Sequence, residues 1–260
     1  MKVTILGSGT SGGVPQVGCR CRTCRSTDPR DKRLRTSAII ETDDDKHILI
    51  DCGPDFREQF LRYQQSLSST SKLIDAIILT HHHYDHIGGL DDLRPVSLFS
   101  MPIYAEEHCI EQLIARLPYC FTPPEKRYLG VPTLDLRPFS LHEPLCIGNT
   151  KIIPFRVMHG KLPITGFRIG DLTYITDMSS LPPGEMQYVE GTKILICNAL
   201  HHRHHPSHMT TEESVDFAQK VGAEETYFIH MSHYCLPHAE EDSLLPPHIH
   251  LAYDGMVLNI

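Results

Sequence analysis

Short apolar runs rich in β-branched residues recur along the chain and predict strands. The runs are residues 3–6, 38–41, 47–50, 76–79, 151–157, 167–169, 172–175, 194–197, 227–229 and 250–253. Compact polar turns rich in Asp, Asn and Gly, which tolerate a positive φ, predict hairpins. These turns are at 43–46, 148–150, 170–171 and 254–255. We therefore expect much of the sheet structure to be antiparallel.

Three segments between these runs have helical spacing of their apolar positions, namely 54–65, 106–117 and 210–221. Thr210 and Glu213 have the spacing of a capping box at the start of the third segment. Strand runs interrupted by helices predict an α/β sandwich in which helices cover the sheets. The proline-bearing segment 118–138 lacks periodicity and is interpreted as a long loop.

The amino-acid composition indicates that the protein binds metal ions. The 260 residues include 18 His and no Trp, and His is the commonest metal ligand near neutral pH. The formal net charge of −8 gives no overall basic surface for a long nucleic acid. The N-terminus lacks the apolar region of a signal peptide, and no stretch approaches the length of a membrane span. We expect residues 1–260 to form one domain of a cytoplasmic protein without membrane contact.

The strongest motif is the segment 80–89, which directly follows the apolar run 76–79. Alternate residues of an extended chain point the same way, so His81 and His83 can bind one metal. Asp85 and His86, on the following turn, can bind a second. Four residues of ligand type in this arrangement predict a dinuclear metal site.

This motif, His-x-His-x-Asp-His after a buried strand, resembles the signature of the metallo-β-lactamase superfamily. The resemblance implies an αββα sandwich of two mixed, mostly antiparallel sheets flanked by helices. It also implies that His159 completes the first metal's ligands and that Asp177 bridges both metals. His230 matches the last ligand of the second metal. Asp51 matches the acidic residue that supports the ligands without touching metal.

Three cysteines, Cys19, Cys21 and Cys24, are too closely spaced for an ordinary disulfide framework. Their thiolates suit a structural zinc, which needs a fourth ligand, and His233 is the candidate. The pattern resembles the zinc clip of the PhnP-type phosphodiesterases, which hydrolyse cyclic phosphates. We expect a zinc-clip loop at about residues 18–35 that shapes the pocket without doing the chemistry.

His208 precedes the helical segment 210–221 and resembles a His-x-Thr element of the superfamily's phosphodiesterases. There the histidine is proposed to protonate the leaving oxygen without binding metal. His201, His202, His204 and His205 lie just upstream and can be solvated or bind metal themselves.

Two further stretches invite a phosphate-binding interpretation. The segment 7–13, rich in glycine, follows a strand but continues into neither Gly-Lys-Ser/Thr nor a helical pattern, so it predicts a flexible loop near the metals. The segment 20–35 carries seven Arg and Lys residues. Such a run is typical of a solvated face, and it can also steer a phosphate.

The resemblance implies a hydrolase that cleaves a small, cyclic phosphodiester with a hydroxide held between two divalent cations. Its catalytic residues are His208, Asp85 and Asp177. Mn²⁺ and Zn²⁺ both suit the imidazole and carboxylate ligands, and one structural Zn²⁺ occupies the clip. The expected partner is the small substrate, and the resemblance suggests a homodimer.

Two alternatives from related proteins stay open. Transfer-RNA 3′-end processing uses a similar histidine motif, although the chain shows no insertion comparable to the RNA-holding arm of those enzymes. A pyrroloquinoline-quinone biosynthesis protein shares the cysteine clip and represents a non-hydrolytic metal-binding function. β-Lactam or thioester hydrolysis is less favoured, because the His208 element and the clip both indicate phosphodiesterases.

Overall fold

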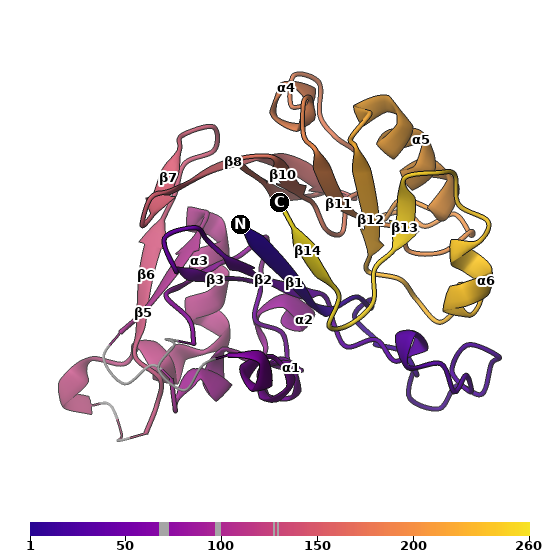
Figure 1. The fold of residues 1–260 in the computed structure, drawn as a ribbon. Coiled ribbons are helices and arrows are strands. Elements are labelled where there is room, and N and C mark those ends of the chain that lie inside the picture. Colours follow the sequence, from indigo (N-terminus) through magenta and orange to yellow (C-terminus); the bar gives the residue numbers. More distant parts are fainter. Residues whose placement is uncertain (68–72, 97–99, 127, 129) are drawn as a thin grey trace.

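Two seven-stranded sheets face each other and carry helices on their outer faces in the computed structural model, which describes residues 1–67, 73–96, 100–126, 128 and 130–260 (Figure 1). The first sheet has the strand order β14 (Val257–Asn259), β1 (Lys2–Gly7), β2 (Ser37–Glu41), β3 (His47–Ile50), β4 (Ala76–Ile78), β5 (Met101–Ala105) and β6 (Leu134–Pro138). The second has the order β13 (Ile249–Leu251), β12 (Glu225–Ile229), β11 (Ile194–Asn198), β10 (Leu172–Tyr174), β9 (Leu162–Ile169), β8 (Thr150–His159) and β7 (Leu145–Ile147).

The helices lie in the connections between strands. The α-helices are α1 (Phe56–Tyr63), α2 (Tyr84–Ile87), α3 (Glu107–Arg116), α4 (Met186–Val189), α5 (Thr211–Val221) and α6 (His238–Asp242). Short 3₁₀ turns are η1 (Pro29–Asp31), η2 (Gln64–Ser66), η3 (Leu90–Leu93), η4 (Pro118–Phe121) and η5 (Pro124–Lys126). The three helices expected from periodicity are α1, α3 and α5, and the capping box of Thr210 and Glu213 at the start of α5 is confirmed.

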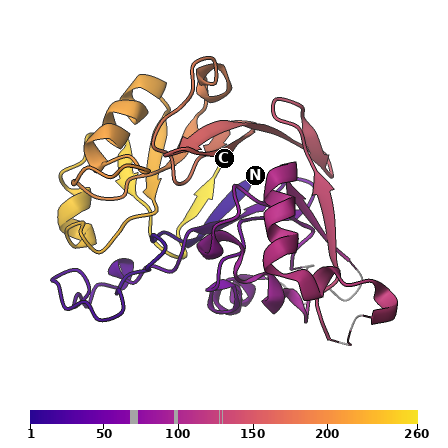
Figure 2. The same cartoon turned by 180° about the vertical axis from the view of Figure 1, so that it is seen from behind.

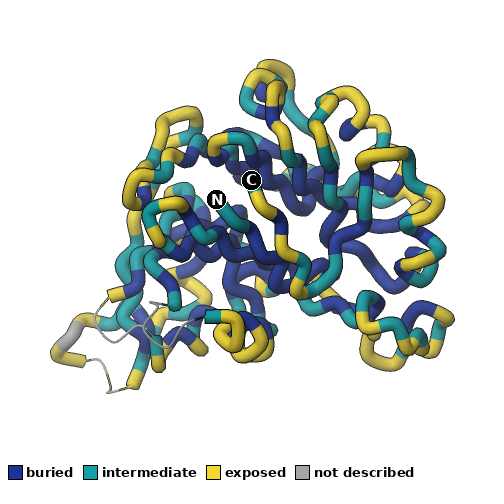
Figure 3. The backbone as a smooth tube through the Cα atoms, in the orientation of Figure 1, coloured by how far each residue is buried: buried dark blue, intermediate teal, exposed yellow. Residues whose placement is uncertain are grey.

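Three apolar layers hold the sandwich together. The central layer joins the facing sheets and contains Ile40 and Ile48 from one sheet and Tyr174 from the other. Outer layers pack α1 and α3 on the first sheet and α5 on the second. Figure 2 shows α3 lying across the outer face of the first sheet, and Figure 3 shows buried strands beneath exposed turns. Because both faces of the inner strands are covered, their sequences are nearly continuous apolar runs.

The expected αββα sandwich of two mixed sheets flanked by helices is confirmed. Antiparallel pairs do not predominate as expected, since six strand pairs are antiparallel and six are parallel among the described strands. The turns at 43–46, 148–150 and 170–171 do form hairpins. The parallel pairs, such as β3–β4 and β11–β12, are joined by helix-bearing connections, which return the chain in the same direction.

Sequence interpretation also missed β5, which lies inside the first sheet, and the edge strands β6, β7 and β14. The end of the expected loop 118–138 forms β6, whose half-exposed Leu134-Asp135-Leu136 alternation is short and flanked by proline. The turn at 254–255 is not a hairpin, because β13 and β14 belong to different sheets and the chain crosses between them. Within the described ranges, none of the helices combines the length and the apolar character that a bilayer crossing requires.

Candidate dinuclear metal site

The expected active-site residues gather where strands end. They are Asp51 after β3, the segment 81–86 after β4, His159 at the end of β8, Asp177 after β10 and His230 after β12. Parallel neighbours such as β3 and β4 end at the same edge of a sheet, so residues far apart in sequence meet there. The site therefore lies at one end of the sandwich, beside α2 (Figure 1).

Three of these residues adopt a left-handed backbone. The φ angles are 59° at Asp51, 54° at Asp177 and 59° at His230. Asp and His accept this region more readily than most residues, although it still costs free energy. The abrupt turn stops each strand and directs the side chain into the site. Backbone strain thus accompanies the site at three separate strand ends.

Two glycines allow the motif segment to pack against the end of β3. A Cβ on Gly53 would lie 2.0 Å from the carbonyl oxygen of Asp85, and a Cβ on Gly89 would lie 2.0 Å from that of Gly53. The Cys52 N–H donates to the carbonyl of His86 at 2.7 Å. These close approaches need glycine and place Asp51 beside His86.

The side chains form two groups of the kind that holds metal ions. The first is His81, His83, His159 and Asp177, and the second is Asp85, His86, Asp177 and His230. Within each group one candidate ligand atom per residue lies within 4.8 Å of all the others. The structure thus brings together all seven residues expected to surround two metals, in the two sets expected.

Asp177 belongs to both groups because its two oxygens face different histidines. Oδ2 lies 3.8 Å from His81 Nε2, whereas Oδ1 lies 3.4 Å from His86 Nε2 and 3.2 Å from His230 Nε2. Tetrahedral ligands with metal bonds of about 2.0–2.1 Å are about 3.3 Å apart. This carboxylate therefore has the orientation of a bridge between two adjacent cations.

In His81, His86 and His159, the ring nitrogen that points away from the site is hydrogen-bonded. The inner nitrogen, which faces the site, is therefore left as an acceptor. Asp51 Oδ2 accepts from His86 Nδ1 at 2.7 Å and from the Thr80 hydroxyl at 2.8 Å, and Thr80 Oγ1 lies 3.0 Å from His81 Nδ1. His159 Nδ1 lies 2.7 Å from the carbonyl oxygen of Ser207, to which it donates. Each ring then directs an Nε2 lone pair inward, as metal-bound histidines do.

In their neutral forms, these rings turn an unprotonated nitrogen toward carboxylate oxygens. His81 Nε2, His86 Nε2 and both ring nitrogens of His230 are buried and have no hydrogen-bond partner among the described residues. His86 Nε2 also lies 3.3 Å from Asp85 Oδ2. Acceptors that face acceptors in a buried site repel one another unless a cation lies between them. The residues present therefore fit two divalent cations.

The charges of the group perturb its pKa values in the direction expected for a cation site. Burial opposes the charged form of His86, yet the carboxylates of Asp177, Asp85 and Asp51 outweigh it and raise the pKa of His86. Burial likewise opposes ionisation of Asp177, but His230 and His86 hold its pKa well below the usual range. The carboxylate of Asp177 thus stays ionised and attracts positive charge.

Asn198 is a supporting residue that sequence interpretation missed. It is fully buried at the end of β11, and its side-chain oxygen accepts from the Met178 N–H at 2.6 Å. Its amide nitrogen donates to the Met178 carbonyl at 3.0 Å. Together these bonds clamp the turn that carries Asp177. An isolated Asn after an apolar run carries no sequence signal of this role.

His208 lies beside the two groups, as expected from its His-x-Thr element. Its Nε2 is 3.4 Å from Asp177 Oδ2, and its ring stacks on His230 with 5.0 Å between centroids. On the other side its Nδ1 lies 3.1 Å from His205 Nδ1 and 3.2 Å from Ser207 Oγ. Burial lowers the pKa of His208 to about 4, although Asp177 acts in the opposite direction.

The cysteines of the clip loop also meet their expected partner. Cys19, Cys21, Cys24 and His233 form a third group of candidate metal ligands. His233 Nδ1 lies 3.2 Å from Cys19 Sγ and 3.6 Å from Cys21 Sγ, where tetrahedral zinc would place these atoms about 3.6 Å apart. The backbone N–H of Cys24 and the ring of His233 outweigh burial and lower the pKa of Cys21 to about 6. This donor set fits a structural zinc.

Comparison with known proteins supports the family. A family model described as a beta-lactamase superfamily domain matches residues 46–231. An octanoyltransferase of Porphyromonas gingivalis is 43% identical over 258 residues, which are 98% of this chain and 51% of that protein. The chain thus spans about half the length of this curated relative.

Solved structures agree with this result. The crystal structure of a new diphosphatase from the PhnP family superimposes with a TM-score of 0.89 at 42% identity, covering 100% of this chain and 97% of that one. Zn²⁺-bound PqqB from Methylobacterium extorquens has a TM-score of 0.82 at 20% identity, covering 100% of both chains, and shares the fold alone. The fold implies divalent metal ions, and the chain belongs to the metallo-β-lactamase superfamily.

Proposed function

We propose that the chain is a metal-dependent phosphodiesterase that hydrolyses a small, cyclic phosphodiester. The observation that carries the proposal is the orientation of Asp177, with one oxygen toward each group of histidines. A shared carboxylate holds two cations side by side, which is an arrangement suited to cleavage of phosphate esters. The PhnP family of the 42% identical diphosphatase supports a bond to phosphorus as the target.

When bound, the two cations supply Lewis-acid charge to the phosphoryl oxygens and lower the pKa of a water molecule. The first cation would be held by His81, His83 and His159 and the second by Asp85, His86 and His230, and Asp177 would contribute to both sites. The oxygen of the water bonds to phosphorus as the bond from phosphorus to the leaving oxygen breaks. The water gives up one proton to the solvent, and the leaving oxygen must receive one proton.

His208 is the residue that we assign to this proton transfer. It touches Asp177 and is not a member of either ligand group. Its low pKa means that the ring is neutral in the protein without substrate. An anionic phosphate beside the ring favours the protonated form of His208. Substrate binding therefore supplies the ring with the proton that it later donates. A structural zinc would be held away from this chemistry, by Cys19, Cys21, Cys24 and His233.

A diphosphate linkage is the second candidate. It is favoured by one specific observation, the name diphosphatase given to the structure that is 42% identical over the whole chain. Each phosphorus of a diphosphate diester, like that of a phosphodiester, has two bridging oxygens, so the same attack applies. The name octanoyltransferase belongs to a relative, and this chain matches about half of that protein. A separate assay of octanoyl transfer tests that activity.

Purified protein loaded with Mn²⁺ or Zn²⁺ should be tested on four chromogenic or chromatographically resolved substrates. These are adenosine 2′,3′-cyclic phosphate, bis(p-nitrophenyl) phosphate, diadenosine diphosphate and p-nitrophenyl phosphate. We expect turnover of the cyclic diester, loss of turnover on chelation and recovery on metal addition. Preferred cleavage of diadenosine diphosphate would select the second candidate. Cleavage of a precursor transfer RNA, or octanoyl transfer, without hydrolysis of any of these small diesters would refute both.

A further inference from the structure

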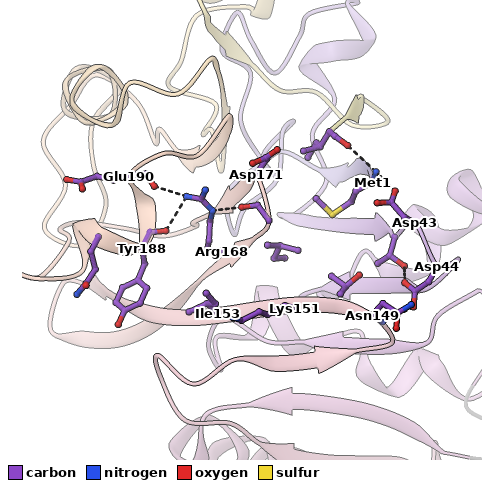
Figure 4. Close-up of a pocket in the computed structure, with 16 residues that line it drawn as sticks. Met1, Asp43, Asp44, Asn149, Lys151, Ile153, Arg168, Asp171, Tyr188 and Glu190 are labelled. Carbon is purple, nitrogen blue, oxygen red and sulfur yellow. Dashed lines mark hydrogen bonds and ion pairs between the residues drawn. The ribbon is translucent and has the colours of Figure 1, made fainter.

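The two ends of the sandwich use their polar groups in different ways. At the strand ends opposite the candidate metal site, a cavity of about 820 Å³ is lined by Met1, Asp43 and Asp171, among other residues (Figure 4). The amino group of Met1 lies 2.6 Å from Asp43, and Lys193 lies 2.7 Å from Asp171, so these carboxylates are already paired within the chain. At the metal end, by contrast, the polar groups of one short turn are bonded to residues of the site.

The turn 176–179 follows β10 and carries two hydroxyls, those of Thr176 and Ser179. Asp177, the residue shared by the two ligand groups, lies inside this turn. Asn198 bonds to both the N–H and the carbonyl of Met178, at 2.6 and 3.0 Å. The side chains of Thr176 and Ser179 therefore start from a backbone that is held in place.

The hydroxyl of Thr176 holds one oxygen of Asp177. It is buried and donates to Asp177 Oδ1 at 2.6 Å. Oδ1 is the oxygen that faces the second group, 3.4 Å from His86 Nε2 and 3.2 Å from His230 Nε2. The torsion that turns a carboxylate is broad, so a carboxylate without a fixed donor can adopt several orientations. The Thr176 hydroxyl thus keeps Oδ1 directed at the second group.

The other oxygen of Asp177 has a different neighbour. Oδ2 faces His81 of the first group and lies 3.4 Å from His208 Nε2. Loss of the Thr176 hydroxyl would therefore leave Asp177 with a hydrogen-bond partner at Oδ2 and release Oδ1. The effect should fall mainly on the second group.

The hydroxyl of Ser179 holds the end of β8 instead. It donates to the carbonyl of Met158 at 2.9 Å and accepts from the Gly160 N–H at 2.8 Å. The Ser179 N–H donates to the same Met158 carbonyl at 2.7 Å. Met158 and Gly160 are the chain neighbours of His159, which belongs to the first group. These three bonds therefore fix His159 relative to the turn that carries Asp177.

We propose that Thr176 and Ser179 are positioning residues that set the two cation sites separately. The hydroxyl of Thr176 sets the affinity of the second group, and that of Ser179 sets the affinity of the first group. The inference rests on the two cations of the proposed function and is independent of which ester is cleaved. Residues that orient metal ligands contribute about 10–100-fold to metal affinity, so the effect of each hydroxyl is measurable.

The occupancy of each site by Mn²⁺ tests the inference without turnover. Anomalous diffraction from crystals equilibrated with graded Mn²⁺ concentrations gives each occupancy, and calorimetric titration measures the two affinities in solution. Thr176→Val keeps the shape of the side chain and removes the hydroxyl. We expect the Mn²⁺ concentration that half-fills the second group to rise about tenfold or more, and that for the first group to change less than about threefold.

Ser179→Ala should have the converse effect and weaken the first group about tenfold or more. The conservative variants keep the hydroxyls, and a merely bulk-dependent role would not predict their behaviour. Thr176→Ser and Ser179→Thr should stay within about threefold of the unaltered protein at both groups. Ser179 borders a cavity of about 670 Å³, which leaves room for the added methyl group.

Matched controls come from the same part of the chain. Thr173 lies on β10, and its buried hydroxyl has no hydrogen-bond partner among the described residues, so Thr173→Val should change neither affinity. Ser180 is exposed, and Ser180→Ala should likewise change neither. Circular dichroism checks the folding of every variant, and Thr176→Ala takes the place of Thr176→Val if the valine variant does not fold.

The outcomes separate this inference from the proposed function. Equal weakening of both groups by Thr176→Val and by Ser179→Ala, or unchanged affinities in both variants, would overturn the inference. Failure of Thr176→Ser to retain the affinity of the second group would do the same. An unaltered protein that filled neither group would overturn the inference and the proposed function together. The expected affinities in a protein that hydrolyses no diester would support the inference and count against the proposed function alone.

Discussion

Asp51→Asn is the most informative single change, because Asp51 controls which nitrogen of His86 carries the proton. The carboxylate accepts three hydrogen bonds, from the Thr80 N–H, the Thr80 hydroxyl and His86 Nδ1, at 2.7–2.8 Å. An asparagine has one oxygen acceptor, and because the Thr80 N–H can only donate, that oxygen faces Thr80 and the NH₂ faces His86. His86 then accepts at Nδ1 and protonates Nε2, which removes the inward lone pair.

The expected effect is a loss of metal affinity in a folded protein. Loss of a residue that orients metal-bound histidines weakens metal binding about 10–100-fold, or about 1.4–2.7 kcal/mol. Elemental analysis and competition with a chromophoric chelator measure stoichiometry and affinity. Asp254→Asn is the matched control, since Asp254 also accepts three hydrogen bonds, from Ser8 and Leu34. If Asp51→Asn bound the active-site metals with affinities within twofold of those of the unaltered protein, the reasoning would be refuted.

Three further predictions concern other parts of the molecule. Cys21→Ser should remove one zinc per chain and lower Tm while leaving two active-site metals, and unchanged zinc content by elemental analysis would contradict the clip. His208→Gln should keep both metals and slow cleavage of a diester with an alkoxide leaving group about 10²-fold or more. A p-nitrophenyl diester, whose leaving group needs no proton, should be affected much less. Equal slowing of both substrates would exclude an acid role for His208. Burial and the neighbouring Arg33 lower the pKa of His238 to about 4. Its contribution to the free energy of unfolding should therefore be complete above the unfolded-state pKa of about 6.5 and be lost as the pH falls toward 4. Denaturant titrations should therefore show a smaller loss of stability between pH 7 and pH 5 in His238→Gln, and identical slopes would reject this assignment.

Local sequence determined the elements and the kinds of ligand. Apolar runs covered on both faces predicted the inner strands other than β5, and spacing predicted the helices α1, α3 and α5. The alternation of His81 and His83 requires only an extended chain, so it could be read without a structure. Edge strands such as β6 escaped detection because half-exposed, proline-flanked segments resemble loops.

The pairing of distant segments depended on the tertiary structure. Nothing local requires Cys21 to meet His233, or Asn198 to clamp the turn after Asp177, because these contacts join segments from different parts of the fold. The family resemblance supplied the expected ligand partners, and the fold alone showed which oxygen of Asp177 faces which histidine. Sequence specifies local conformation and side-chain chemistry, whereas the directions and distances that select a reaction come from packing.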